Sequence, residues 1–259
     1  MAAGKGLPRL LCLHGLYQNS SIFQAKTRSI AHALDGVAEL VYQCGPHQVT
    51  PTPRLGGTRP PTHRPGVERP DFRAWWMTEC SGWDVSWRSI RQVLEEKGPF
   101  LGVIGFSQGA TLAGLMCTKA VQIRLNYKPE VAVLISGRQS ATHYEEYNLG
   151  MAKGVVSVHC YGNLDQVTPP NKSLELHKLF HEAEPLSTLS VEWAGGHTVP
   201  PAGTPLEETI VRAVQSCLAD SRNGAMEALQ GAPSWAVKSE PDAAAVAAYL
   251  QDDGARHGR

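Results

Sequence analysis

The sequence predicts an α/β protein in which a mainly parallel β-sheet is covered by helices on both faces. Short apolar, β-rich segments recur along the chain, and helix-like stretches lie between most of them. Such alternation is typical of parallel sheets, because each parallel crossover needs a connecting element that packs back onto the sheet. The length of 259 residues suits one domain of this kind.

The individual elements follow from this alternation. The predicted strands are residues 10–13, 38–42, 101–104, 131–135, 155–161 and 189–193. The predicted helices are residues 21–34, 84–96, 108–126, 171–184 and 206–219. Because the helix at 206–219 is the last element that the predicted fold requires, we expect the domain to span residues 1–219.

Two regions depart from the alternation. Residues 44–70 are dense in Pro, Gly, Thr and Arg, which disfavours regular structure and predicts a long surface loop. From Asp220 onward the spacing of strands and helices stops. We expect residues 220–259 to form a flexible C-terminal appendage with one short helix at 243–250.

Composition narrows the possible function. Lys plus Arg number 24, as do Asp plus Glu, so no net field attracts nucleic acid or an anionic membrane surface. No apolar run reaches the roughly 18 residues of a membrane span, and the first residues lack the apolar part of a secretory signal. The six cysteines show no Cys-x-x-Cys spacing and are expected to be reduced. We therefore expect a cytoplasmic protein with a small-molecule substrate and no nucleic-acid partner; the sequence does not specify its oligomeric state.

The strongest chemical signal lies at residues 100–110. An apolar strand runs into Gly105-Phe106-Ser107-Gln108-Gly109 and then into a helix rich in Ala, Leu and Gly. This context is typical of the nucleophile elbow of α/β-hydrolases, in which the glycines avoid collisions of a Cβ with neighbouring backbone. The serine then lies above the sheet edge at the positive end of a helix dipole. Ser107 is the predicted nucleophile.

A serine nucleophile needs a base and an orienting carboxylate, which in this fold follow in the order Ser, Asp or Glu, His. Asp165 comes just after the strand at 155–161, and His197 follows the strand at 189–193 on a Gly-Gly loop that we expect to be flexible. The carboxyl ends of parallel strands meet at one sheet edge, so both side chains are expected beside Ser107. The alternatives are an ordinary turn aspartate and a surface histidine.

Ester hydrolysis also needs two backbone N–H groups that face the developing oxyanion. Gln108, directly after the nucleophile, is one expected donor. The loop after the first strand, His14-Gly15-Leu16-Tyr17, should supply the other. We expect Leu16 in this role, with Tyr17 as the next candidate, and a structural role for His14.

Several landmarks in a fixed order resemble those of the FSH family of serine hydrolases, which includes the ovarian-tumour-gene esterases of animals and the thioesterases that release fungal polyketides. The landmarks, within about residues 8–219, are Leu11-Cys12-Leu13-His14-Gly15, Gly45-Pro46-His47, Trp75-Trp76, Gly98-Pro99-Phe100, Gly105-Phe106-Ser107-Gln108-Gly109-Ala110, Ile135-Ser136-Gly137, residues 162–165 and Gly195-Gly196-His197. The resemblance implies that Ser107, Asp165 and His197 are the catalytic triad. It also implies hydrolysis of carboxylic esters or thioesters through an acyl-enzyme, with no metal or organic cofactor.

The chain departs from the family pattern at two positions. Asn163 replaces a frequent acidic residue two before the triad aspartate, which leaves Asp165 as the carboxylate of that turn. Arg138 stands where an apolar aromatic residue is common. Arg138 either pairs with a carboxylate at position 145 or 146, or faces the substrate pocket, where it would favour anionic substrates.

The predicted substrate-binding residues are Tyr17, Trp76 and Arg138. Trp76 is one of four tryptophans within residues 75–87, which are expected either to pack in the core or to form part of an acyl-binding wall. His177 and His181 lie one helical turn apart, but a packed helix with a polar outer face explains this spacing, so no metal site is expected. The alternative to an enzyme is a catalytically silent binding protein with the same fold.

Overall fold

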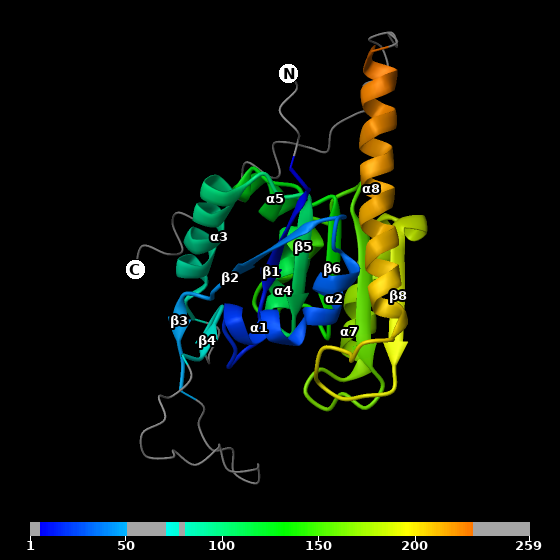
Figure 1. The fold of residues 1–259 in the computed structure, drawn as a ribbon. Coiled ribbons are helices and arrows are strands. Elements are labelled where there is room, and N and C mark those ends of the chain that lie inside the picture. Colours follow the sequence, from blue (N-terminus) through cyan, green and yellow to red (C-terminus); the bar gives the residue numbers. More distant parts are fainter. Residues whose placement is uncertain (1–5, 51–70, 78–80, 230–259) are drawn as a thin grey trace.

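The computed structural model describes residues 6–50, 71–77 and 81–229, with the helical backbone alone for 220–229. Its centre is a six-stranded parallel sheet with the order β2-β1-β5-β6-β7-β8 (Figure 1). The strands are β1 (Arg9–Leu13), β2 (Glu39–Gln43), β5 (Gly102–Phe106), β6 (Val131–Ile135), β7 (Val156–Gly162) and β8 (Thr188–Trp193). All six strands predicted from the sequence are present.

Helices cover both faces of the sheet (Figure 1). One face packs against α1 (Ser20–Lys26), α2 (Arg28–Ala33) and α8 (Pro205–Leu229). The other packs against α3 (Trp83–Lys97), α4 (Gln108–Met116), α5 (Lys119–Leu125) and α7 (Pro170–Ala183). The remaining elements of the described residues are a two-stranded antiparallel pair, β3 (His47–Gln48) and β4 (Arg73–Ala74), the helix α6 (Tyr144–Asn148) and the short 3₁₀ helix η2 (Pro185–Ser187). The predicted fold class is confirmed.

Alternation of side chains along the strands divides the apolar core in two. On β1, Leu11 and Leu13 pack toward α3, α4 and α7, whereas Leu10 and Cys12 pack toward α1, α2 and α8. All four side chains are at most 1% exposed. Since successive residues of a strand point to opposite faces, a strand covered on both sides is apolar at every position. This double burial explains why central strands such as β1, β5 and β6 were readable in the sequence as continuous apolar runs.

Two predicted helices are each split by a threonine. The helix expected at 21–34 breaks at Thr27, whose hydroxyl donates to the Phe23 carbonyl and contacts the Tyr42 hydroxyl. The helix expected at 108–126 breaks before Thr118, whose hydroxyl accepts from the Val121 N–H as the cap of α5. A threonine side chain can replace backbone hydrogen bonds in this way, which a pattern of apolar residues does not reveal.

The C-terminal helix is longer than predicted. It continues through Leu229 rather than ending at 219, so the start of the expected appendage is helical. The domain boundary at 219 stays a prediction, and the short helix expected at 243–250 lies outside the described residues. Within the predicted loop at 44–70, His47–Gln48 forms a short strand, while residues 51–70 lie outside the described part.

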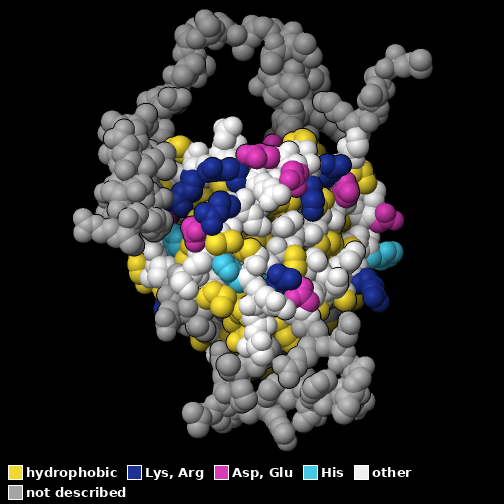
Figure 2. Space-filling model, turned by 90° about the vertical axis from the view of Figure 1, so that its left-hand side faces the viewer, with side chains coloured by type: hydrophobic (Ala, Val, Ile, Leu, Met, Phe, Trp, Pro, Cys, Tyr) yellow, Lys and Arg dark blue, Asp and Glu magenta, His cyan; other side chains and the backbone are white. Residues whose placement is uncertain are grey.

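Other expectations concern the surface and the thiols. Basic and acidic side chains lie intermixed on the α3 side of the molecule (Figure 2), and ion pairs such as Arg88–Asp84 form on that helix. The cysteines of the described part are free thiols, as expected, and Cys80 lies outside it. Among the described helices, none has both the length and the apolar character needed to cross a bilayer.

Candidate active site

Ser107 lies in a strained turn between β5 and α4. Its backbone has φ 54° and ψ −115°, a conformation that residues other than glycine rarely adopt. A Cβ on Gly105 would collide with the Gly109 carbonyl, and one on Gly109 would collide with the Leu13 carbonyl. The Ser107 N–H donates to the Ile135 carbonyl at 2.9 Å, which fixes the turn against β6. The glycines predicted to permit an elbow are therefore required by close backbone approach.

His197 lies between Ser107 and Asp165. Its Nε2 is 2.9 Å from Ser107 Oγ, and its Nδ1 is 2.7 Å from Asp165 Oδ2. A carboxylate only accepts hydrogen bonds, so Nδ1 carries the proton and Nε2 is left to accept from the serine hydroxyl. The His197 side chain is 17% exposed and that of Asp165 is fully buried. The three side chains predicted from separate segments thus meet at the carboxyl edge of the sheet.

The second oxygen of Asp165 is held by backbone. Oδ1 accepts from the N–H groups of Val167 at 2.9 Å and Thr168 at 2.8 Å. These contacts fix the plane of the carboxylate and direct Oδ2 toward His197. They were missed in the sequence, although an aspartate followed by a turn and a prolyl helix start is typical of this side-chain-to-backbone motif.

The loop that carries His197 is packed closely at Gly195. A Cβ on Gly195 would collide with the Trp193 indole, and one on Gly162 would collide with the Gly195 carbonyl. The Leu164 N–H donates to the Gly195 carbonyl at 3.0 Å, which ties the His197 loop to the Asp165 turn. Gly195 is thus required by close packing, whereas a Cβ on Gly196 would meet no atom closer than 3.8 Å; the flexibility expected of this loop stays a prediction.

The candidate oxyanion donors occupy the two loops beside Ser107. Neither the Leu16 N–H nor the Gln108 N–H donates to a protein group in the part of the chain that the structure describes. The Tyr17 N–H, the other candidate, donates to the Arg73 carbonyl at 3.1 Å. This bond leaves Leu16 as the better candidate, in agreement with the order of preference from the sequence.

The Gln108 side chain has a role that the sequence did not indicate. Its Oε1 accepts from the Trp75 N–H at 3.0 Å, and its Nε2 donates to the Trp76 carbonyl at 3.1 Å. The Trp75 indole N–H donates in turn to the His14 carbonyl at 2.9 Å. Trp75 thereby connects the residue after Ser107 to the loop of Leu16. No sequence spacing signals a contact between segments this far apart.

His14 is buried at the base of the same loop. Its Nε2 accepts from the Gly45 N–H at 2.8 Å, and its Nδ1 is 2.8 Å from the Gly15 carbonyl, to which it donates. Because one ring nitrogen donates and the other accepts, the imidazole of His14 is neutral, with its proton on Nδ1. Burial lowers the pKa of His14 to about 4, the hydrogen bond to Gly15 opposes this shift, and the charge of Arg73 adds to it. His14 therefore holds the loop rather than acting as a base.

The three predicted substrate-binding residues lie around these loops. Trp76 is half-buried and stacks on Trp83 with ring centroids 4.2 Å apart. Tyr17 is half-buried in a left-handed turn, with φ 57°. Arg138 is exposed, and its N–H lies 3.4 Å from the Thr111 hydroxyl on α4. Their contacts with substrate stay predictions.

The predicted histidine pair on α7 packs face to face. The His177 and His181 rings stack with centroids 5.8 Å apart, and His177 also contacts the buried His159. Within the described residues, no group of three or more His, Cys, Asp or Glu side chains is arranged to hold a metal ion.

Comparison with protein families matches residues 5–208 to the family described as serine hydrolase (FSH1). Relatives include human esterase OVCA2, 34% identical over 225 residues, covering 78% of this chain and 93% of that protein. Esterase OVCA2 of Danio rerio is 30% identical over 213 residues, covering 76% of this chain and 92% of that protein.

Solved structures show the same fold. Esterase PE8 has a TM-score of 0.58 at 18% identity, covering 83% of this chain and 94% of that chain. Acyl-protein thioesterase 2 of Zea mays has a TM-score of 0.53 at 20% identity, covering 83% and 95%.

Proposed function

Because this chain belongs to the serine hydrolase (FSH1) family, we propose that it cleaves carboxylic esters or thioesters through an acyl-enzyme on Ser107. The observation that carries the proposal is the continuous chain of contacts from Ser107 Oγ through both nitrogens of His197 to Asp165. If Asp165 were only a turn aspartate and His197 only a surface histidine, their side chains would not need to align with Ser107.

In the first half of the reaction, the Ser107 oxygen attacks the acyl carbon as its proton passes to His197 Nε2. The imidazolium that forms is stabilised by the buried Asp165 carboxylate, which accepts from Nδ1. The negative charge on the former carbonyl oxygen is met by the N–H groups of Leu16 and Gln108. Collapse of this intermediate expels the alcohol or thiol, which takes the proton from His197.

The second half repeats these steps with water. His197 removes a proton from the water as it attacks the acyl-serine, and the proton returns to Ser107 when the acid leaves. The same two N–H groups stabilise the second tetrahedral intermediate. Every step uses groups of the chain itself and the two substrates.

A fluorophosphonate probe tests the proposal directly. We expect stoichiometric labelling of the protein at Ser107, loss of labelling in Ser107→Ala, and hydrolysis of short acyl esters or thioesters by the unmodified chain. A panel of matched oxyesters and thioesters of increasing acyl length measures the preferred class through kcat/KM. Absence of both labelling and turnover would instead favour a silent binding protein.

A further inference from the structure

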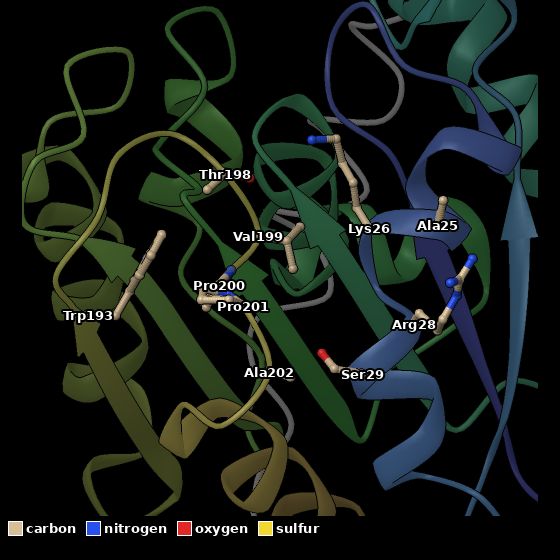
Figure 3. A pocket seen from close by; sticks show the side chains of 10 residues that line it. All are labelled: Ala25, Lys26, Arg28, Ser29, Trp193, Thr198, Val199, Pro200, Pro201 and Ala202. Carbon is tan, nitrogen blue, oxygen red and sulfur yellow. The ribbon is translucent and has the colours of Figure 1, made fainter.

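A pocket of about 540 Å³ lies between the α1–α2 region and the loop that follows His197 (Figure 3). Its volume falls within the range of sites for small organic molecules. The lining residues are Ala25, Lys26, Arg28, Ser29, Trp193, Thr198, Val199, Pro200, Pro201 and Ala202. The mechanism proposed above gives this pocket no role.

The charged side chains that line the pocket are all cationic. Its lining contains two cationic residues, Lys26 and Arg28, and no Asp or Glu. Neither cation forms an ion pair with another residue in the part of the chain that the structure describes. Lys26 extends from α1 toward the loop of Thr198, whereas the Arg28 side chain points away from that loop (Figure 3). An anion in the pocket would therefore meet Lys26 first.

The chemical lining is otherwise mixed. Ser29 and Thr198 supply hydroxyl groups that can donate to an anion, and Val199, Pro200 and Pro201 supply apolar surface for an aliphatic stem. A lysine ammonium binds phosphate as a compact point charge with three donors. The lining thus suits a short apolar chain that ends in a phosphate.

The position of the pocket relates it to one part of the substrate. In the proposed mechanism His197 gives its proton to the departing oxygen or sulfur, so the leaving group lies on the His197 side of Ser107. Thr198 follows His197 directly and begins the pocket wall, which continues through Ala202. The acyl chain, which stays on Ser107 after the leaving group departs, has no need to enter this pocket.

We infer that this pocket receives the leaving group and favours alcohols or thiols that carry a phosphate. The inference rests on the proposed hydrolase function and narrows its substrate class. Lys26 supplies the principal charge contact, and Arg28 adds a weaker, more distant attraction. Binding of a leaving group on the enzyme lowers KM more than it raises kcat, because the contact is present in both ground state and transition state.

A matched substrate series tests the inference. Butyrate esters of α,ω-alkanediols with two to eight carbons are compared with the same esters carrying a terminal phosphate. At the chain length that fits, kcat/KM of the phosphate ester should exceed that of the hydroxyl ester about tenfold, a factor typical of one partly exposed charge-assisted contact. Lys26→Met should reduce this ratio about tenfold, and Arg28→Met should reduce it less.

The control is Lys178→Met, which removes a lysine paired with Glu182 on α7 and should leave the ratio unchanged. Melting temperatures of all variants exclude unfolding as the cause of any change. A ratio near one at every chain length, or an equal effect of Lys26→Met and Lys178→Met on the ratio, overturns the inference. Hydrolysis of the hydroxyl esters that requires Ser107 would leave the proposed function standing in that case; absence of this hydrolysis together with absence of fluorophosphonate labelling would refute the hydrolase function itself.

Discussion

Asparagine at position 165 would keep the shape of the aspartate while reversing the hydrogen bond to His197. Asp165 Oδ1 accepts from the N–H groups of Val167 and Thr168, so an amide at this position must place its oxygen there. Its NH₂ group then faces His197 Nδ1 as a donor. The imidazole can meet that donor only in the tautomer with the proton on Nε2, which cannot accept the proton of Ser107.

The size of the effect follows from these contacts. Restoring the active tautomer requires the amide to turn, which gives up two backbone hydrogen bonds worth about 1 kcal/mol each. The variant also loses the carboxylate that stabilises the imidazolium, which we take as about 2–3 kcal/mol for a buried charged partner. The total of about 4–5 kcal/mol corresponds to a decrease of three to four powers of ten in kcat.

The assay is steady-state hydrolysis of a chromogenic short-chain ester by wild type and Asp165→Asn, with thermal unfolding measured in parallel. The asparagine variant should melt near the wild-type temperature because its oxygen keeps both backbone donors. Asp165→Ala leaves those two buried N–H groups unpaired and should melt lower. A kcat for Asp165→Asn within tenfold of wild type would refute the assignment of Asp165. Asp71 and Asp84, whose carboxylates pair with Arg73 and Arg88, would then be the next residues to test.

Three further predictions follow from the fold. Trp75→Phe removes the indole hydrogen bond to the His14 carbonyl, which holds the loop of the proposed donor Leu16. Initial rates should show kcat lowered about tenfold or more and KM within threefold of wild type. A change in KM alone would contradict this prediction. Because the pKa of His14 falls from its ordinary value near 6.5 to about 4 on folding, the unfolded chain binds the extra proton between these values. The contribution of His14 to the free energy of unfolding should therefore fall as pH decreases from 6.5 toward 4, by about 1 kcal/mol per pH unit near pH 5. In a plot of the free energy from urea unfolding against pH, His14→Gln should show a shallower slope than wild type by this amount, and equal slopes would contradict the prediction. A chain ending at Leu229, which keeps α8 whole, should retain kcat/KM within about threefold, and a larger loss with normal solubility would place residues 230–259 in the catalytic unit.

The sequence predicted those features that depend on local pattern. The strained turn at Ser107 could be predicted because a side chain on either neighbouring glycine, Gly105 or Gly109, would collide with backbone. Asp165 and His197 could be placed because parallel strands bring their carboxyl ends to one edge, whatever the exact register. The flanking glycines therefore predicted the turn at Ser107, and the topology of a parallel sheet predicted the positions of Asp165 and His197.

Features that depend on approach between distant segments were not predictable. Thr27 ends α1 and Thr118 caps the start of α5 through side-chain hydrogen bonds, yet threonine also occurs within helices, so its presence alone decides nothing. The close packing of Gly195 on Trp193 looked in the sequence like a flexible Gly-Gly pair. A glycine required by a neighbouring ring and one required by backbone freedom are identical in the sequence.

The two proposed oxyanion donors follow different strands, since Leu16 lies in the loop after β1 and Gln108 begins α4 after β5, and their spacing depends on a third segment. Residues 73–76 contact both: the Arg73 carbonyl accepts from Tyr17, and the Trp75 and Trp76 backbones are held by the Gln108 side chain. The Trp75 indole adds a bond to the loop that holds Leu16. The proposed donors are backbone N–H groups, so their placement depends on residues such as Trp75, which holds the two loops together through the Gln108 side chain and the His14 carbonyl.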